Sequence, residues 1–244
     1  MPTPSYFLLL VLVLVILVSY SLFLREKVLP KEYVQKFHIG AFLKNFWVDP
    51  RKHPDFAWAW LTRFIPGFGY FLGTGYLFYY LQDAVHYEKL FPGQGIEQGV
   101  STLTIISTLV SLVSTLLGGI LSDRFKRRKL FIVLANMIIT AAMFVFGLVP
   151  SWPVLLVNVA VLGLGFGTYV AVDTALVTQV LPSVNDRGKD MGIINIANTL
   201  PQSLAPVVAA YIISTTHSYF ALFTIGAVIT LLGILVVRPI KAVR

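Results

Sequence analysis

Apolar residues form long runs along the chain, and short polar stretches separate these runs. Seven apolar segments can be marked, at residues 6–24, 58–82, 99–121, 130–149, 153–180, 191–214 and 219–238. About 20 residues of helix cross a hydrocarbon core of about 30 Å, so runs of this length are typical of transmembrane helices. The pattern therefore predicts an all-α integral membrane protein with seven spans.

Composition agrees with this interpretation. The 244 residues are 57% hydrophobic and only 12% charged, and their mean hydropathy is +0.79. The first apolar segment also differs from a secretory signal peptide, because no basic residue precedes it, its apolar run is long and no A-x-A site follows. We expect it to be retained as a span.

The basic residues indicate how the spans are oriented. Of the 19 Lys and Arg residues, all except Lys89 fall on one side of the predicted membrane. The positive-inside rule places that side in the cytoplasm, with the N-terminus outside and the C-terminus inside. A plasma (inner) membrane fits this arrangement. The net charge of +8 is thereby explained by orientation, and nucleic acid is not an expected partner.

The loop at residues 25–57 is the longest segment on the cytoplasmic side. Within it, Val34, Phe37, Ala41 and the pair Phe46–Trp47 alternate with lysines at approximately helical spacing. This spacing predicts an amphipathic helix that lies on the membrane surface. A solvated linker with scattered aromatic residues is the alternative.

The sequence lacks the residue patterns of an enzyme. It has no cysteine, which excludes disulfides and thiolate metal sites, and its four histidines lack ligand spacing. No G-x-S-x-G, H-E-x-x-H or Walker pattern occurs. We therefore expect no enzymatic activity, no cofactor and no metal.

Polar residues inside the predicted spans are candidates for a solute pathway, because ionisable groups in lipid are costly. Asp173 is our candidate for proton coupling or gating, and Tyr169 lies one turn away. The other pathway candidates are Tyr70 in the second span and the stripe Asn195, Asn198 and Gln202 in the sixth. A break is expected at Pro66–Gly67, and Pro201 and Pro206 interrupt the hydrogen-bond ladder of the sixth span, so the freed carbonyls must face protein or water.

Each of these features also has a purely structural interpretation. The amide stripe could serve hydrogen bonding between helices, and Asp173 could be a structural, paired carboxylate. The series Gly163, Gly165 and Gly167 predicts a packing surface. Broken helices combined with a buried carboxylate and an amide stripe favour a polar pathway.

One charged cluster resembles a known motif. Residues 119–129 read GILSDRFKRRK, which is similar to G-x-x-x-D-R-x-G-R-R-K, a loop motif of the major facilitator superfamily, with Lys126 in place of its second glycine. The stretch at 173–206, with its R-G-x-x-x-G segment, resembles the tenth and eleventh helices of such transporters. FAWAWLTRF at 56–64 is similar to the start of their seventh helix.

The resemblance implies a domain organisation. Residues 1–24 would be helix six, residues 25–57 the cytoplasmic linker, and residues 58–244 the six-helix C-terminal bundle. The first five helices would then be missing. In this family the solute lies between two halves that rock against each other. The chain would supply one wall, with a separate N-terminal half or a second copy as its partner.

The function that this predicts is secondary active transport of a small polar solute by alternating access. A sugar-like solute is slightly favoured, and proton coupling is a hypothesis based on Asp173. The alternative is a truncated or half-size module that transports only with a partner half or as a homodimer. A cytoplasmic gate is expected at the charged loop, formed by Gly119, Asp123, Arg124, Arg127, Arg128 and Arg187. In this hypothesis Asp123, Arg124, Arg127, Asp173 and Arg187 form one charge network.

Overall fold

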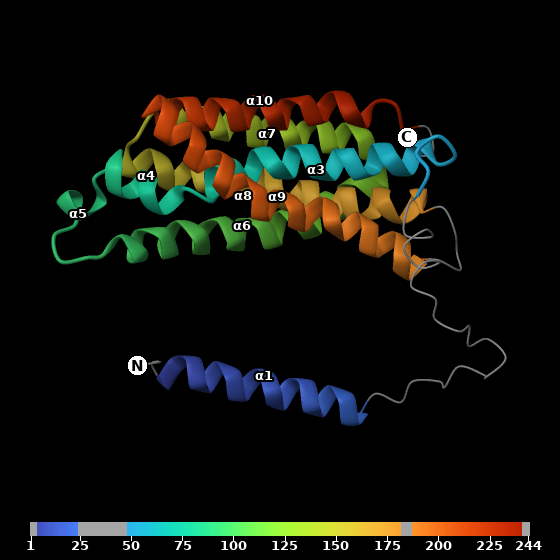
Figure 1. Ribbon diagram of the computed structural model, residues 1–244, viewed down its shortest axis with the longest axis horizontal. Helices are drawn as coiled ribbons and strands as arrows, with labels where there is room; N and C mark the ends of the chain where they lie inside the picture. Colours follow the sequence, from blue (N-terminus) through green and yellow to red (C-terminus); the bar gives the residue numbers. More distant parts are fainter. Residues whose placement is uncertain (1–3, 24–47, 182–186, 241–244) are drawn as a thin grey trace. The chain divides into compact units, whose positions relative to one another are not determined.

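Figure 1 shows the computed structural model of the chain, whose described residues, 4–23, 48–181 and 187–240, form helices joined by short loops, with no strand among them. The chain divides into two units, Met1–Asn45 and Phe46–Arg244. The first unit contains α1 (Pro4–Phe23), whose described side chains are almost all apolar and exposed. This is the surface that a helix surrounded by lipid requires. The linker helix expected within 25–57 lies mainly outside the described residues.

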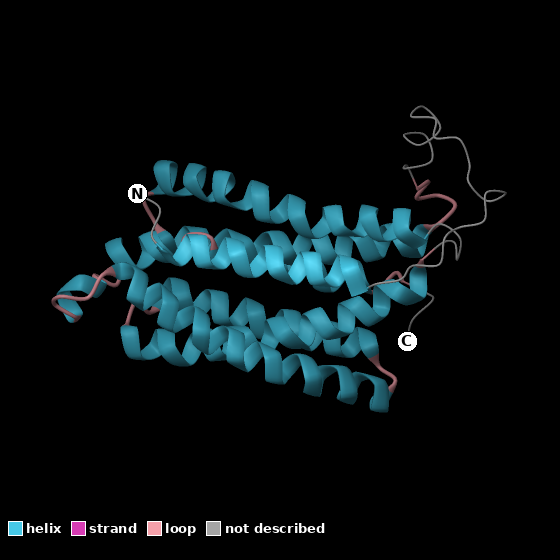
Figure 2. Cartoon of the chain, turned by 90° about the horizontal axis from the view of Figure 1, so that it is seen from below, coloured by secondary structure: helices cyan, strands magenta, loops and turns pink. Residues whose placement is uncertain are grey.

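The second unit holds the remaining helices, whose long members run side by side in both views (Figures 1 and 2). Their bounds are α3 (Pro54–Thr74), α4 (Leu77–Asp83), α5 (Tyr87–Leu90), α6 (Ile96–Phe125), α7 (Arg128–Leu148), α8 (Trp152–Val180), α9 (Arg187–Thr216) and α10 (Tyr219–Val237). Among the described residues, five helices are long and apolar enough to cross a membrane: α6, α7, α8, α9 and α10. The prediction of an all-α membrane protein is confirmed.

The second predicted span is divided, but not where the sequence suggested. The expected break at Pro66–Gly67 is wrong, because α3 continues through Pro66 to Thr74. The division falls at residues 75–76, where the Tyr76 N–H donates to the carbonyl of Gly73 at 3.2 Å. That bond tightens the last turn of α3 before α4 begins. Likewise, α9 continues through Pro201 and Pro206, each of which removes one N–H from its hydrogen-bond ladder without ending the helix.

Small residues bring α6 and α8 close together. A Cβ atom at Gly163 or Gly167 would collide with the backbone of Ser107 or Ser111, respectively. The Ser114 hydroxyl donates to the Gly163 carbonyl at 3.2 Å, which adds a polar link between the helices. Small residues permit this kind of approach in membranes, where lipid removes the hydrophobic drive for helices to associate. The prediction of a glycine packing surface on α8 is confirmed.

Candidate functional site

A buried ion pair joins α3 to α8. The Arg63 Nε donates to Asp173 Oδ2 at 2.6 Å, and the two side chains are 10% and 1% exposed. Arg63 lies more than two turns inside α3, and its side chain is buried against α8. The expectation that Asp173 joins the charged loop at 123–129 is therefore corrected, because its partner is Arg63.

A second polar contact lies directly beside the ion pair. The Tyr169 hydroxyl donates to the Thr62 carbonyl at 2.8 Å. Pro66 has no N–H, so the carbonyl four residues earlier, that of Thr62, loses its partner within the helix. Tyr169 supplies the missing donor, which explains how α3 stays continuous at Pro66. Because Tyr169 is buried and its hydroxyl is engaged, it does not offer that group to a solute in this structure.

Asp173 retains unused hydrogen-bonding capacity. Its Oδ1 atom is buried and accepts no hydrogen bond from the described residues. Buried polar atoms are usually paired, so an unpaired carboxylate oxygen marks a place where a proton, water or another donor can bind. This arrangement suits a group that changes partners better than one that is permanently locked.

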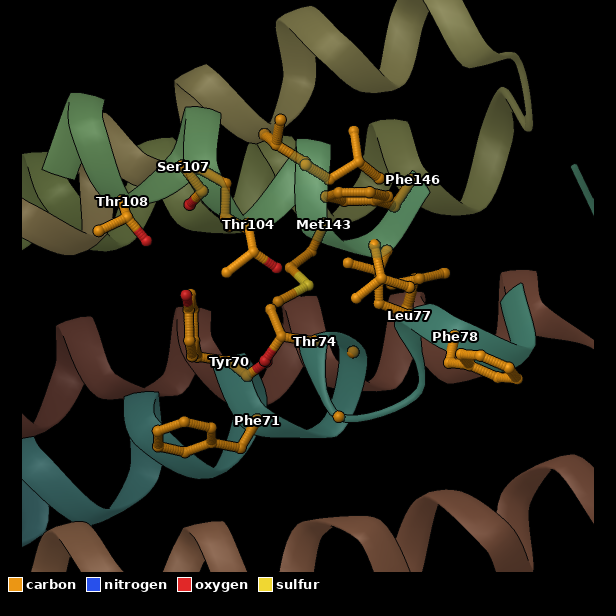
Figure 3. Close-up of a pocket in the computed structure, with 17 residues that line it drawn as sticks. Tyr70, Phe71, Thr74, Leu77, Phe78, Thr104, Ser107, Thr108, Met143 and Phe146 are labelled. Atoms are coloured by element: carbon orange, nitrogen blue, oxygen red, sulfur yellow. The ribbon is translucent and has the colours of Figure 1, made fainter. Parts of the chain in front are cut away.

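A cavity of about 360 Å³ lies between α3 and α6, with α4, α7, α8 and α10 completing its walls. We call it the α3–α6 cavity. Figure 3 shows Tyr70 and Thr74 on one side of it, and Thr104, Ser107 and Thr108 on the other. The Tyr70 ring stacks on Phe166 of α8, with 4.2 Å between the ring centroids. Of the residues predicted to line a pathway, Tyr70 is the one that lines this cavity.

Sequence reasoning missed the hydroxyl face of α6 as a possible site. Thr104, Ser107 and Thr108 are spaced i, i+3 and i+4, which places them on one face of the helix. That spacing was visible in the sequence, but hydroxyl residues in a span more often serve close packing. Within the described chain, no group of three His, Asp or Glu side chains could hold a metal ion.

The amide stripe of α9 lies away from the other polar groups. Asn195 and Gln202 are exposed and Asn198 is half-buried, whereas Ile194 and Ala197 on the neighbouring face of α9 are fully buried. In the part of the chain that the structure describes, the three amide side chains make no hydrogen bond to Tyr169 or Asp173. The stripe is thus directed outward from the packed bundle, and its role in a pathway stays a prediction.

The charged loop is a tight connection between α6 and α7. Arg128 binds Asp123 at 2.7 Å and also donates to the Ala175 carbonyl of α8 at 2.9 Å. Arg124 and Arg127 are exposed, and the side chain of Arg187 lies outside the described residues. Gly119 lies on α6 beside Ala171 of α8. The loop is therefore anchored to α8 through Arg128, not through the expected network on Asp173.

The backbone conformation of Lys126 explains why the family motif has a glycine at this position. Its φ angle is +52°, in the left-handed region that glycine adopts without strain. We expect Lys126→Gly to raise the free energy of unfolding by about 0.5–1 kcal/mol. Lys126→Ala removes the same charge but keeps a Cβ atom, so it should give no such gain. Thermal unfolding in detergent measures both variants, and equal effects would contradict a conformational cause.

The chain also resembles known proteins in sequence. Residues 93–243 match the sequence profile of the Major Facilitator Superfamily. Over 137 residues, 54% of this chain, it is 33% identical to a "Probable 4-methylmuconolactone transporter" of Cupriavidus pinatubonensis (strain JMP 134 / LMG 1197), and the match covers 32% of that protein. Over 125 residues, 51% of this chain, it is 29% identical to the "Uncharacterized MFS-type transporter YfiU" of Bacillus subtilis (strain 168), with 24% of that protein covered.

The matched segments span about a third or less of the length of these curated relatives. The profile, in contrast, covers well over half of this chain, and it includes the charged loop and all of α6 to α10. Helices of membrane-spanning length and the transporter names of both relatives agree with a family of transporters and not of enzymes. The chain belongs to the major facilitator superfamily of membrane transporters.

Proposed function

We propose that the chain is the C-terminal half of a secondary active transporter that moves a small polar solute by alternating access. The observation that carries the proposal is the Arg63–Asp173 ion pair, buried between α3 and α8. Bringing two charges out of water costs several kcal/mol per ion, and good geometry repays this only in part. A buried pair is thus weak as a stabilising device, which favours a role in function.

Proton coupling follows from the chemistry of this pair. A proton on Asp173 neutralises the carboxylate and removes most of its attraction for Arg63. The contact between α3 and α8 then weakens, and α3 carries Tyr70 at the α3–α6 cavity. Protonation of Asp173 would in this way change the shape of the α3 wall of the α3–α6 cavity. The preference for a sugar-like solute rests on the amide and tyrosine side chains of the predicted pathway, which suit a hydroxyl-rich ligand.

The half-size alternative starts from the exposed face of α6, which either lipid or a protein partner can cover. Of the five membrane-spanning helices, α6 is the least buried. Large side chains such as Leu112, Leu116 and Ile120 are exposed along it. Such a face must meet lipid or another protein surface. The alternative proposal is that a separate N-terminal half, or a second copy of this chain, covers it and is required for transport.

Uptake by proteoliposomes tests both proposals. The 244-residue chain is reconstituted, and entry of two small uncharged solutes, a sugar and a neutral lactone (the ring type in one relative's name), is measured with and without a pH gradient. We expect gradient-driven uptake that Asp173→Asn reduces at least tenfold. Glu88→Gln is the matched control, because it makes the same change at an exposed position and should leave uptake unchanged.

The possible outcomes separate the proposals. Equal gradient-driven uptake by Asp173→Asn would refute proton coupling through this residue. Uptake per chain that rises with the protein-to-lipid ratio would support a homodimer. If the chain moves no solute at any ratio, the need for a separate partner half is supported instead.

A further inference from the structure

Two sets of hydroxyl groups on α6 differ in their hydrogen bonding, and Ser101 and Ser111 belong to neither set. One set donates hydrogen bonds to helix carbonyls at 2.8–3.2 Å: Thr102, Ser114, Thr115 and Ser122. The other set, Thr104, Ser107 and Thr108, lines the α3–α6 cavity and has no hydrogen-bond partner among the described residues. Hydroxyls in membrane helices commonly bond to their own helix. The second set is therefore available to a ligand.

Tyr70 supplies a fourth available hydroxyl from the opposite wall. Its OH group likewise makes no hydrogen bond within the described parts of the chain, and Figure 3 shows it directed towards the side of the cavity that carries Ser107 and Thr108. Stacking on Phe166 fixes the ring in this position. The hydroxyls of α3 and α6 thus form one polar edge across which a ligand group can be hydrogen-bonded.

Apart from Thr74, whose hydroxyl donates to the Tyr70 carbonyl at 2.9 Å, the remainder of the α3–α6 cavity is apolar. Phe71, Leu77, Met143 and Phe146 contribute to its walls, and none of its 17 lining residues carries a charge. Thr104 and Thr108 are exposed, so the cavity is open on their side. An ionised solute would lose part of its hydration on the apolar side without meeting a counter-charge, which is unfavourable. Aromatic rings and a methionine sulfur, in contrast, pack favourably against a flat ring.

The size and polarity of the cavity further limit the class of ligand that it can bind. Its volume of about 360 Å³ lies at the small end of the range for ligand sites, which is about 300–1,000 Å³. A sugar has hydroxyl groups all around its ring, so several of them would face apolar side chains without partners. A ring with one polar edge leaves no such group unpaired.

We propose that the α3–α6 cavity binds an uncharged, single-ring solute that carries one or two hydroxyl or carbonyl groups on one edge. The proposal rests on the transport function above and names the class of its solute. It departs from a sugar-like solute, because the cavity has a single polar edge. The Thr104, Ser107, Thr108 and Tyr70 hydroxyls bind the polar edge of the solute, and the aromatic and thioether wall binds its ring.

Ligand-observed saturation-transfer NMR on the chain in lipid nanodiscs tests this class. The probes are benzyl alcohol, benzoate, which has the same ring but a charge, and glucose, which has no apolar edge. Empty nanodiscs correct for partition into lipid. We expect benzyl alcohol to bind at least ten times more tightly than either of the other probes.

Variants locate the binding. Thr104→Val with Thr108→Val removes two hydroxyls with little change in shape, and we expect about fivefold weaker binding of benzyl alcohol. Thr102→Val is the matched control, because the Thr102 hydroxyl bonds to its own helix outside the cavity. Ser107→Leu, which fills the cavity, should abolish binding. Thermal unfolding confirms that each variant is folded.

Each outcome of these binding experiments either supports or overturns the proposed class of solute. Benzoate or glucose binding as tightly as benzyl alcohol, no binding of benzyl alcohol, or binding that ignores the cavity variants would overturn the assigned class. Selective binding of benzyl alcohol by a chain that moves no solute in proteoliposomes would support the class and count against transport by the chain alone.

Discussion

Asp173→Leu will lower the free energy of unfolding of the helical bundle by about 3–5 kcal/mol. The Arg63 side chain is only 10% exposed in the structure, so loss of Asp173 leaves its charge buried and uncompensated. Titration with sodium dodecyl sulfate in mixed micelles, followed by circular dichroism, measures the loss. The exposed pair supplies the control: Asp123→Leu breaks the contact with Arg128 and should cost at most about 1 kcal/mol.

The double variant Arg63→Met/Asp173→Leu distinguishes stability from function. Apolar residues of similar volume often replace a buried ion pair without loss of stability, so we expect most of the stability to return. Gradient-driven uptake should stay absent, because no carboxylate remains to accept a proton. If the Asp173→Leu variant is as stable as the native chain, the prediction is wrong, because Arg63 then does not stay buried with an unpaired charge.

Gly167→Ala will have the second-largest effect on stability. Its Cβ atom would overlap the Ser114 hydroxyl and the Ser111 carbonyl of α6, and a backbone carbonyl cannot move aside without shifting its helix. We expect a loss of about 1–3 kcal/mol or more, with α6 displaced from α8. The same micelle titration measures it, and a change below about 0.5 kcal/mol would contradict the close packing.

Gly192→Ala is the matched control on α9. No described atom lies within 4 Å of the Cβ that this change adds. Alanine is favoured over glycine inside a helix by about 0.8–1 kcal/mol, so this variant should be neutral or slightly more stable. A gain at Gly192 with a loss at Gly167 separates helix propensity from packing.

Much of the fold could be predicted from the sequence, because lipid forces long apolar runs into helices whatever their detailed side chains. The break at residues 75–76 could not. Pro66–Gly67 is the stronger local signal, but it is overridden by a hydrogen bond from Tyr169, which lies on another helix. Local rules describe which backbone groups a proline frees, and only the tertiary structure shows what satisfies them.

The candidate site was predicted less well, for a related reason. Asp173 was correctly singled out as an unusual residue inside a span, but its partner is 110 residues away in the sequence. Arg63 fits the positive-inside pattern, so the sequence gives no sign that its side chain is buried. The charged loop gave a specific family resemblance, yet the contact of Arg128 with the Ala175 carbonyl depends on where α8 ends.

The paired contacts of α8 with α3 have a mechanical consequence. Tyr169 and Asp173 lie one turn apart on α8, and they hold consecutive residues of α3, Thr62 and Arg63. A sliding motion that releases one contact strains the other, and releasing either alone leaves a buried polar group without a partner. Half-released geometries are therefore the least favourable ones. Displacement of α8 along α3 should be cooperative, with two well-defined end positions and few intermediates.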